Sequence, residues 1–204
     1  MSTINNQILS TMQSLNYGAY TSYDFLELGN YKNISKSLET LEDNKAIGRI
    51  IRGVYYLNKY DEVTGLYEKP SIEDIAYAIA RQYNYIIIPS GNLCLNIIGI
   101  SSQIPSEYVF SSSGPYREYN VGSIKIKFKH VTSKELSLYS KNILIAIQTF
   151  KTLGKDNIDQ NIIDKINSFL NKEDKKQILE KRNNITNWIY SYLKKIAENQ
   201  ECTI

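Results

Sequence analysis

Residues 21–57, with the sequence TSYDFLELGNYKNISKSLETLEDNKAIGRIIRGVYYL, decide the fold of the N-terminal part of the chain. Thr21 is followed three residues later by Asp24, a capping-box spacing that predicts the start of a helix. Gly29 and Asn30 are residue types that end one helix and begin the next. Apolar residues then recur at helical spacing, which predicts a second amphipathic helix: Ile34, Leu38 and Leu41.

A tight two-stranded hairpin is expected after this second helix. Gly53 supplies the positive φ that a tight strand reversal needs, and Arg49 and Arg52 lie in or beside that reversal. Residues 4–15 form an earlier amphipathic helix. The order of helix, turn, helix and hairpin predicts a winged helix-turn-helix, a module whose usual ligand is double-stranded DNA.

The polar face of the second helix carries candidate DNA contacts. At about 100° per residue, Lys32, Asn33 and Lys36 lie opposite the apolar stripe. The Asn33 amide offers a donor and an acceptor, with which asparagine reads adenine in the major groove. Its alternative role is to hydrogen-bond the first turn of the helix. Together with Arg49 and Arg52 at the hairpin, these residues form a predicted set of DNA contacts.

Charge is unevenly distributed along the 204 residues, which carry a formal net charge of +3. Residues 1–70 hold seven Lys and Arg against eight Asp and Glu, whereas residues 71–204 hold 17 against 13. Phosphate contacts usually dominate the affinity for DNA. The basic groups of the N-terminal part must therefore gather on one face to bind it.

The cysteine content and the apolar runs point to a cytoplasmic protein. Two cysteines, Cys94 and Cys202, provide neither a framework of disulfides nor a metal-binding spacing. Cys94 lies in an apolar run and is expected to be buried, and Cys202 falls in the C-terminal tail. The first residues lack the pattern of a signal peptide, and no apolar run is long enough to span a membrane.

The rest of the chain predicts a second domain in which helices accompany a small antiparallel sheet. Residues 58–70 are polar and end in Pro70, so we expect a linker between a winged-helix domain over residues 1–66 and a C-terminal domain over residues 71–204. Helices are predicted over residues 72–84, 91–99, 133–153 and 157–170, and Asn171 is expected to cap a last helix. Strands are predicted over residues 85–89, 108–112, 116–121 and 123–130. Because helices and strands are segregated, the fold class is α+β.

One predicted strand has a basic face. Residues 123–130 alternate apolar side chains with Lys125, Lys127 and Lys129, and the nearest acidic residues in the sequence are Glu118 and Glu135. Such a strand is typical of a half-buried antiparallel sheet, and its lysines predict a contact with an acidic surface.

The sequence contains no recognisable catalytic constellation. The single histidine, His130, has no evident partner, and no phosphate-binding loop or nucleophile elbow is present. We therefore predict no catalytic residue, no metal, no cofactor and no small-molecule substrate.

Three blocks together resemble a known family: GRIIRGVYYLNKY at residues 48–60, IIIPSGNLCLNIIGIS at residues 86–101, and SSSGPYREYNVGSIKIKFKH at residues 111–130. They are similar to the AbiEi-type antitoxins of bacterial type IV toxin–antitoxin systems, and more narrowly to their DUF6088 branch. The resemblance implies a winged-helix domain that represses its own operon and a C-terminal domain that carries antitoxin activity. It also implies a neighbouring gene that encodes a nucleotidyltransferase toxin. From its charge, the surface of Lys125, Lys127 and Lys129 is expected to meet an acidic patch of that toxin or to compete for its nucleic-acid substrate.

The expected function is therefore that of an antitoxin and transcriptional repressor without catalytic activity. One alternative is a plain DNA-binding regulator whose C-terminal domain binds a ligand or dimerises. A second alternative is an enzyme, such as a nuclease that docks through the winged helix. An acidic cluster near residues 125–129 in space would be the signature of that enzyme.

Overall fold

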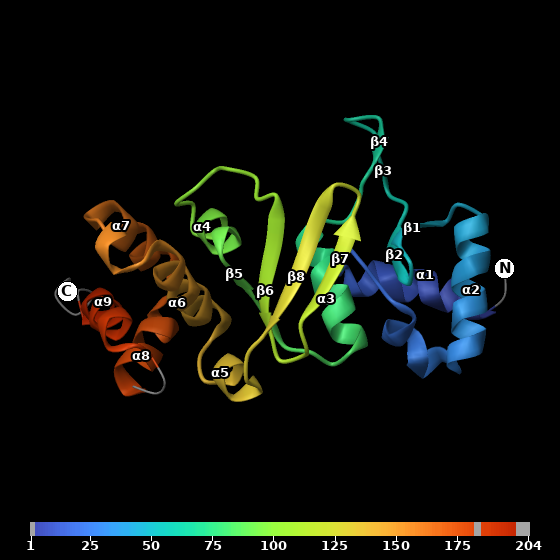
Figure 1. The fold of residues 1–204 in the computed structure, drawn as a ribbon. Coiled ribbons are helices and arrows are strands. Elements are labelled where there is room, and N and C mark those ends of the chain that lie inside the picture. The colour runs from blue at the N-terminus through green and yellow to red at the C-terminus, as the bar shows by residue number, and fades with distance from the viewer. Residues whose placement is uncertain (1–2, 182–184, 199–204) are drawn as a thin grey trace. The chain divides into compact units, whose positions relative to one another are not determined.

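The computed structural model describes residues 3–181 and 185–198 and has the expected α+β class. The chain divides into two compact units, Met1–Tyr85 and Ile86–Ile204 (Figure 1). Within the described residues, no helix has the length and apolar character needed to cross a membrane.

The N-terminal unit contains helices, a hairpin and a short two-stranded ribbon. Its elements are α1 (Thr3–Leu15), the 3-10 helix η1 (Ser22–Leu28), α2 (Tyr31–Asp43), β1 (Ile47–Ile51), β2 (Val54–Leu57), β3 (Tyr60–Asp61), β4 (Leu66–Tyr67) and α3 (Ile72–Gln82). The first helix of the predicted helix-turn-helix is thus a 3-10 helix. The backbone N–H of Thr21 donates to the Asp24 carboxylate at 2.8 Å, as the capping-box spacing predicts.

The apolar faces of α1, η1 and α2 enclose one core with the hairpin of β1 and β2. Its buried members are Ile8, Met12, Tyr20, Phe25, Ile34, Leu38, Leu41, Ile47 and Tyr55. Tyr20 and Tyr55 exchange two backbone hydrogen bonds of 2.8 Å, which fasten the segment before η1 to strand β2. Gly53 has a φ of +80° at the hairpin turn, as its position in the sequence predicts.

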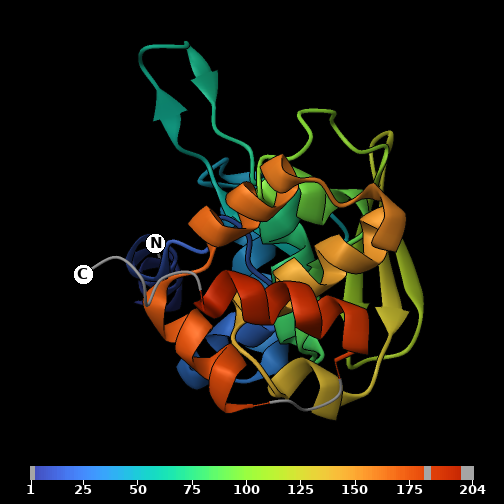
Figure 2. The ribbon, with the colours of Figure 1, turned by 90° about the vertical axis from the view of Figure 1, so that its left-hand side faces the viewer.

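Two predictions about residues 58–84 need correction. The segment expected to be a linker forms the antiparallel ribbon β3–β4, which stands out from the helices of this unit (teal in Figure 2). Helix α3 packs on η1 and β2 within the N-terminal unit. The predicted division between residues 66 and 71 therefore differs from the observed one, which follows Tyr85.

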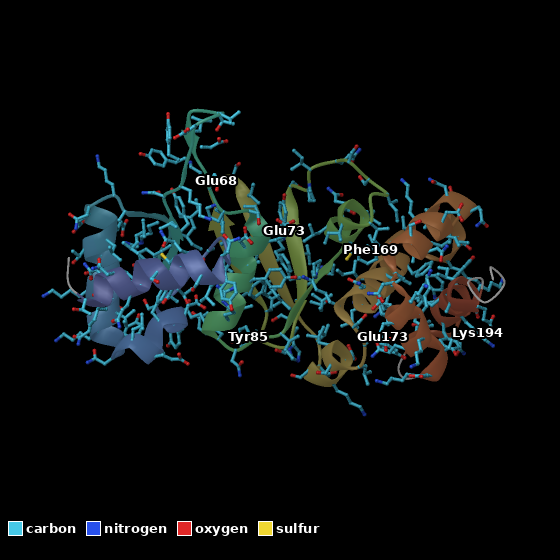
Figure 3. The ribbon with its side chains drawn as sticks, turned by 180° about the vertical axis from the view of Figure 1, so that it is seen from behind. Glu68, Glu73, Tyr85, Phe169, Glu173 and Lys194 are labelled. Atoms are coloured by element: carbon cyan, nitrogen blue, oxygen red, sulfur yellow. The ribbon has the colours of Figure 1, made fainter. Side chains whose placement is uncertain are left out.

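The C-terminal unit places several helices beside a four-stranded sheet. Its elements are β5 (Ile87–Ser90), α4 (Asn92–Ile97), β6 (Glu107–Ser112), β7 (Arg117–Val121), β8 (Ile124–His130), α5 (Ser133–Ser137), α6 (Lys141–Leu153), the 3-10 turn η2 (Lys155–Asn157), α7 (Gln160–Phe169), α8 (Lys172–Glu180) and α9 (Asn187–Glu198). Figure 3 shows this unit from behind, with Phe169 on α7, Glu173 on α8 and Lys194 on α9.

The sheet is mixed, which corrects the prediction of an antiparallel sheet. The strand order is β5-β6-β8-β7, and β8 pairs antiparallel with β7 but parallel with β6. Pro89 lies in β5, an edge strand, where the missing N–H of a proline is tolerated.

Two of the predicted C-terminal helices are each divided into two. The predicted helix 133–153 is interrupted because Ser140 caps α6 and its hydroxyl also donates to Asp174 at 2.5 Å. Gly154 ends α6 as expected, and its N–H donates to the carbonyl of Phe150. Asn171 caps α8 rather than one long final helix, and α9 follows separately.

Candidate nucleic-acid interface

Helix α2 is capped by Asn30, so the side chain of Asn33 is not needed for capping. The Asn30 side chain caps the helix by accepting a hydrogen bond of 2.9 Å from the backbone N–H of Asn33. The side-chain amide of Asn33 is therefore not used in the cap, and Asn33 is exposed. The alternative role for Asn33, bonding the first turn through its own side chain, is taken by Asn30.

Asn33 and Lys36 line an open groove between α1 and α2. The groove is formed by Ile4, Asn5, Asn33, Lys36, Ser37, Thr40 and Asn44. Lys32 is also exposed and lies one helical turn before Lys36. The structure thus brings the three predicted contacts of α2 onto one exposed arc that continues toward Thr40 and Asn44.

The two arginines of the hairpin lie in different environments. Arg49 pairs with Glu42 at 3.8 Å and lies 5.9 Å from the ring centroid of Tyr55. Its guanidinium is directed toward Glu42, a residue of α2 that does not line the groove. Arg52 is exposed at the hairpin turn beside Gly53. Arg52 forms no ion pair with any other described residue, so it is the better placed of the two to meet phosphate.

This arrangement can support base reading and phosphate binding from one helix. An amide presents a donor and an acceptor to a base edge, whereas ammonium and guanidinium groups bind phosphate. The N-terminal unit as a whole holds eight Lys and Arg against ten Asp and Glu. The net charge of the unit therefore does not favour DNA, and among these residues only Lys32 and Lys36 concentrate positive charge on one arc of α2.

The lysines of β8 do not form a free basic surface, which corrects the sequence prediction. The Lys127 ammonium donates to Glu107 of β6 at 2.6 Å and lies 3.8 Å from Glu118 of β7. Lys125 lies 3.9 Å from Glu118. Lys129 is exposed and has no ion pair among the described residues.

Proton affinities in this cluster follow from its contacts. The hydrogen bond from Lys127 to Glu107 raises the pKa of the lysine. The pKa of Glu118 is lowered, first by a hydrogen bond from the Tyr116 hydroxyl and then by the two lysines. We call Glu107, Glu118, Lys125 and Lys127 the charge ladder, since cross-strand pairing balances two cations with two anions.

His130 and Cys94 have structural partners. The Nδ1 atom of His130 lies 2.9 Å from the carbonyl of Gly114 and ties the end of β8 to the turn before β7. Cys94 is buried as predicted, its thiol donates to the carbonyl of Pro89 at 3.0 Å, and burial raises its pKa to about 12. Cys202 lies outside the described residues. In the described ranges, no three His, Cys, Asp or Glu side chains gather as a metal site would require.

Sequence reasoning missed two kinds of site residue. The helical period also puts Thr40 on the polar face of α2, but Thr40 was not among the predicted contacts, and Asn44 at the end of the helix was not predicted. Glu107 carried no such signal, because its place beside Lys127 depends on the pairing of β6 with β8. Strand order across a sheet is set by tertiary packing and is not encoded in local spacing.

The comparison with known families assigns the chain. Residues 7–178 match the family described as "Family of unknown function (DUF6088)". This match covers well over half of the chain, which therefore belongs to the DUF6088 family. No curated protein matches the sequence. The link from this family to AbiEi-type antitoxins stays a prediction.

Proposed function

We propose that this DUF6088 protein is an antitoxin that also represses its own operon by binding promoter DNA through a winged-helix N-terminal unit. The observation that carries the DNA-binding part is the exposed arc of Lys32, Asn33 and Lys36 on a helix followed by the β1–β2 hairpin. The antitoxin part rests on the resemblance of the sequence blocks to AbiEi-type proteins. The partner toxin would be a nucleotidyltransferase encoded by the neighbouring gene.

In this proposal α2 enters the major groove and the hairpin contacts the flanking backbone. Lys32, Lys36 and Arg52 bind phosphate, and Asn33 contacts a base edge. Arg49 has a positioning role, because its pair with Glu42 joins β1 to α2.

A reporter assay tests repression and protection in the same cells. The upstream promoter drives a reporter, and the toxin gene is induced separately in the presence of the full chain. We expect the wild type to repress the reporter and to restore growth. The variant carrying Lys32→Ala, Asn33→Ala and Lys36→Ala should lose repression but retain protection when expressed from a foreign promoter. Failure of the wild type to restore growth, with repression intact, would instead favour a plain regulator.

The enzyme alternative has one observation in its favour. Glu107 and Glu118 converge on Lys127, which is the acidic cluster that a nuclease near this strand would need. The charge ladder holds only two carboxylates, both engaged by lysine. We expect no hydrolysis of DNA or RNA with or without divalent metal. Turnover that disappears in Glu107→Gln and Glu118→Gln would establish the enzyme in place of the antitoxin.

A further inference from the structure

A cavity of about 340 Å³ lies on the surface of the C-terminal unit, far along the chain from the candidate DNA contacts. It is lined by Lys155, Asn187, Trp188, Ser191, Tyr192 and Lys195. Five of these residues belong to α9, and Lys155 comes from η2. The lining combines two aromatic rings, two ammonium groups and two small polar side chains.

The two aromatic side chains of this cavity, Trp188 and Tyr192, pack against Phe150. Phe150 of α6 is fully buried and stacks on Tyr192 with ring centroids 5.5 Å apart and an interplanar angle of 17°. Trp188 stands nearly perpendicular to both rings, with its centroid 6.2 Å from Phe150 and 6.4 Å from Tyr192. Trp188 and Tyr192 are half-buried, so each is held by the core yet keeps part of its surface for the cavity. Rings that are already ordered lose little conformational freedom when a flat ligand stacks on them.

The polar rim of the cavity is positively charged. Lys155 and Lys195 are exposed, and neither forms an ion pair with any residue in the described part of the chain. By contrast, Lys194, the neighbour of Lys195 on α9 (labelled in Figure 3), pairs with Glu198 at 3.4 Å. The Ser191 hydroxyl donates to the carbonyl of Asn187 at 3.0 Å, which leaves its oxygen able to accept a hydrogen bond from a ligand.

We propose that this cavity binds one nucleoside phosphate unit, with the base stacked on one of the two perpendicular rings, Trp188 or Tyr192, and the phosphate between Lys155 and Lys195. Aromatic side chains bind any nucleobase through its flat face, and stacking contributes about tenfold or more in affinity per base. Ammonium groups supply the charge for phosphate, and Ser191 can accept from a sugar hydroxyl. The cavity has the volume of a small-ligand site, which suits a single nucleotide. A free mononucleotide and the phosphorylated end of a single-stranded nucleic acid share this chemistry.

The fluorescence of Trp188 offers a direct test, because it is the only tryptophan of the chain. The full-length protein is titrated with adenosine monophosphate, adenosine, ribose phosphate and a short single-stranded oligonucleotide with a terminal phosphate, with free tryptophan as the optical control. We expect saturable quenching by adenosine monophosphate, by the oligonucleotide, or by both. Adenosine and ribose phosphate should each bind more weakly, since each lacks one half of the ligand. Quenching by the free nucleotide alone identifies a nucleotide site, and quenching by the oligonucleotide alone identifies a site for a single-stranded end.

Charge variants complete the test without disturbing the aromatic wall. The double variant Lys155→Glu and Lys195→Glu should weaken nucleotide binding about tenfold or more, because charged hydrogen bonds to the phosphate are lost. Lys194→Glu, on the same helix but outside the cavity lining, is the matched control and should bind as the wild type does. Absence of saturable quenching by any phosphorylated probe overturns the proposal. Equal affinity in the wild type and the double variant does so as well.

Discussion

Arg81 is the residue that joins α3 to the rest of the N-terminal unit. Its guanidinium donates to the Asp24 carboxylate at 2.8 Å and to the carbonyl of Ala19 at 2.8 Å. The same group lies 4.3 Å from the centroid of the Tyr17 ring. Asp24 is almost completely buried, with a side-chain exposure of 6%. A carboxylate in that environment depends on its cationic partner, so this contact ties α3 to η1 across more than fifty residues of sequence.

Arg81→Ala should therefore destabilise the N-terminal unit. We expect a loss of roughly 2–3 kcal/mol in the free energy of unfolding, because the buried Asp24 loses a charged hydrogen-bond partner. Chemical denaturation followed by circular dichroism measures this change. Arg52→Ala, at the exposed hairpin turn, is the control and should change stability by less than about 0.5 kcal/mol. Equal effects of the two substitutions would show that the Arg81 contact does not hold α3.

Asn33 and Lys36 should contribute differently to DNA binding. Asn33→Ala is expected to reduce discrimination between the operator and random duplex by about 1–3 kcal/mol, since the amide meets a base edge. Lys36→Ala should weaken binding to both duplexes by the same factor, because phosphate contacts carry no sequence information. Competition gel shifts with specific and random DNA separate the two effects. If both substitutions reduce binding to both duplexes equally, the assigned roles are wrong.

At the scale of elements, local signals predicted the N-terminal helices well. The helical spacing of Ile34, Leu38 and Leu41 and the capping residue Asn30 correspond to the observed α2. The predicted helix after Thr21 is also present, although it is a 3-10 helix and not an α-helix. Residues 58–70 were misassigned, because polar composition does not exclude a short ribbon whose backbone groups pair with one another.

The C-terminal elements show where sequence spacing stops being informative. At the break between α5 and α6, Ser140 caps α6 and also bonds Asp174, a residue distant in sequence. The charge ladder likewise arises from strand order, which places β8 between β6 and β7. Sequence spacing correctly put three lysines on one face of β8 but could not show which acids lie beside them.

The charge ladder predicts unequal roles for the lysines of β8. Lys127→Ala should lower the melting temperature, because it leaves Glu107 and Glu118 close together without the cation between them. Lys129→Ala is the matched control on the same strand face and should leave the melting temperature unchanged. Thermal unfolding of the two variants measures the difference. A larger effect from Lys129 would mean that the ladder does not stabilise the sheet.

At the scale of the whole molecule, opposite charges accompany the two units. The unit up to Tyr85 holds two more acidic than basic residues, whereas residues 86–204 hold 16 Lys and Arg against 11 Asp and Glu. This division favours separate tasks for the two units. The C-terminal unit also has its own core, which α6, α8 and α9 share.

Protection against the toxin should therefore survive removal of the first unit. A truncated chain that begins at Ile86 keeps all four strands of the larger sheet and every helix from α4 onward. We expect it to restore growth when it is co-expressed with the toxin, and we expect it to lose promoter repression. Circular dichroism of the truncated chain is the control that establishes whether it is folded. A folded truncation that gives no protection would place the antitoxin activity in the N-terminal unit or in the complete chain.

Binding of the full chain to its own promoter at increasing salt tests the central claim most directly. We expect specific binding. The logarithm of the observed association constant should fall linearly with the logarithm of salt concentration, with a slope of roughly −0.9 for each phosphate contact. The variant with Lys32→Ala, Lys36→Ala and Arg52→Ala should show a shallower slope than the wild type. Absence of binding at low salt, or a signal that salt does not change, would contradict a DNA-binding role for α2 and the hairpin.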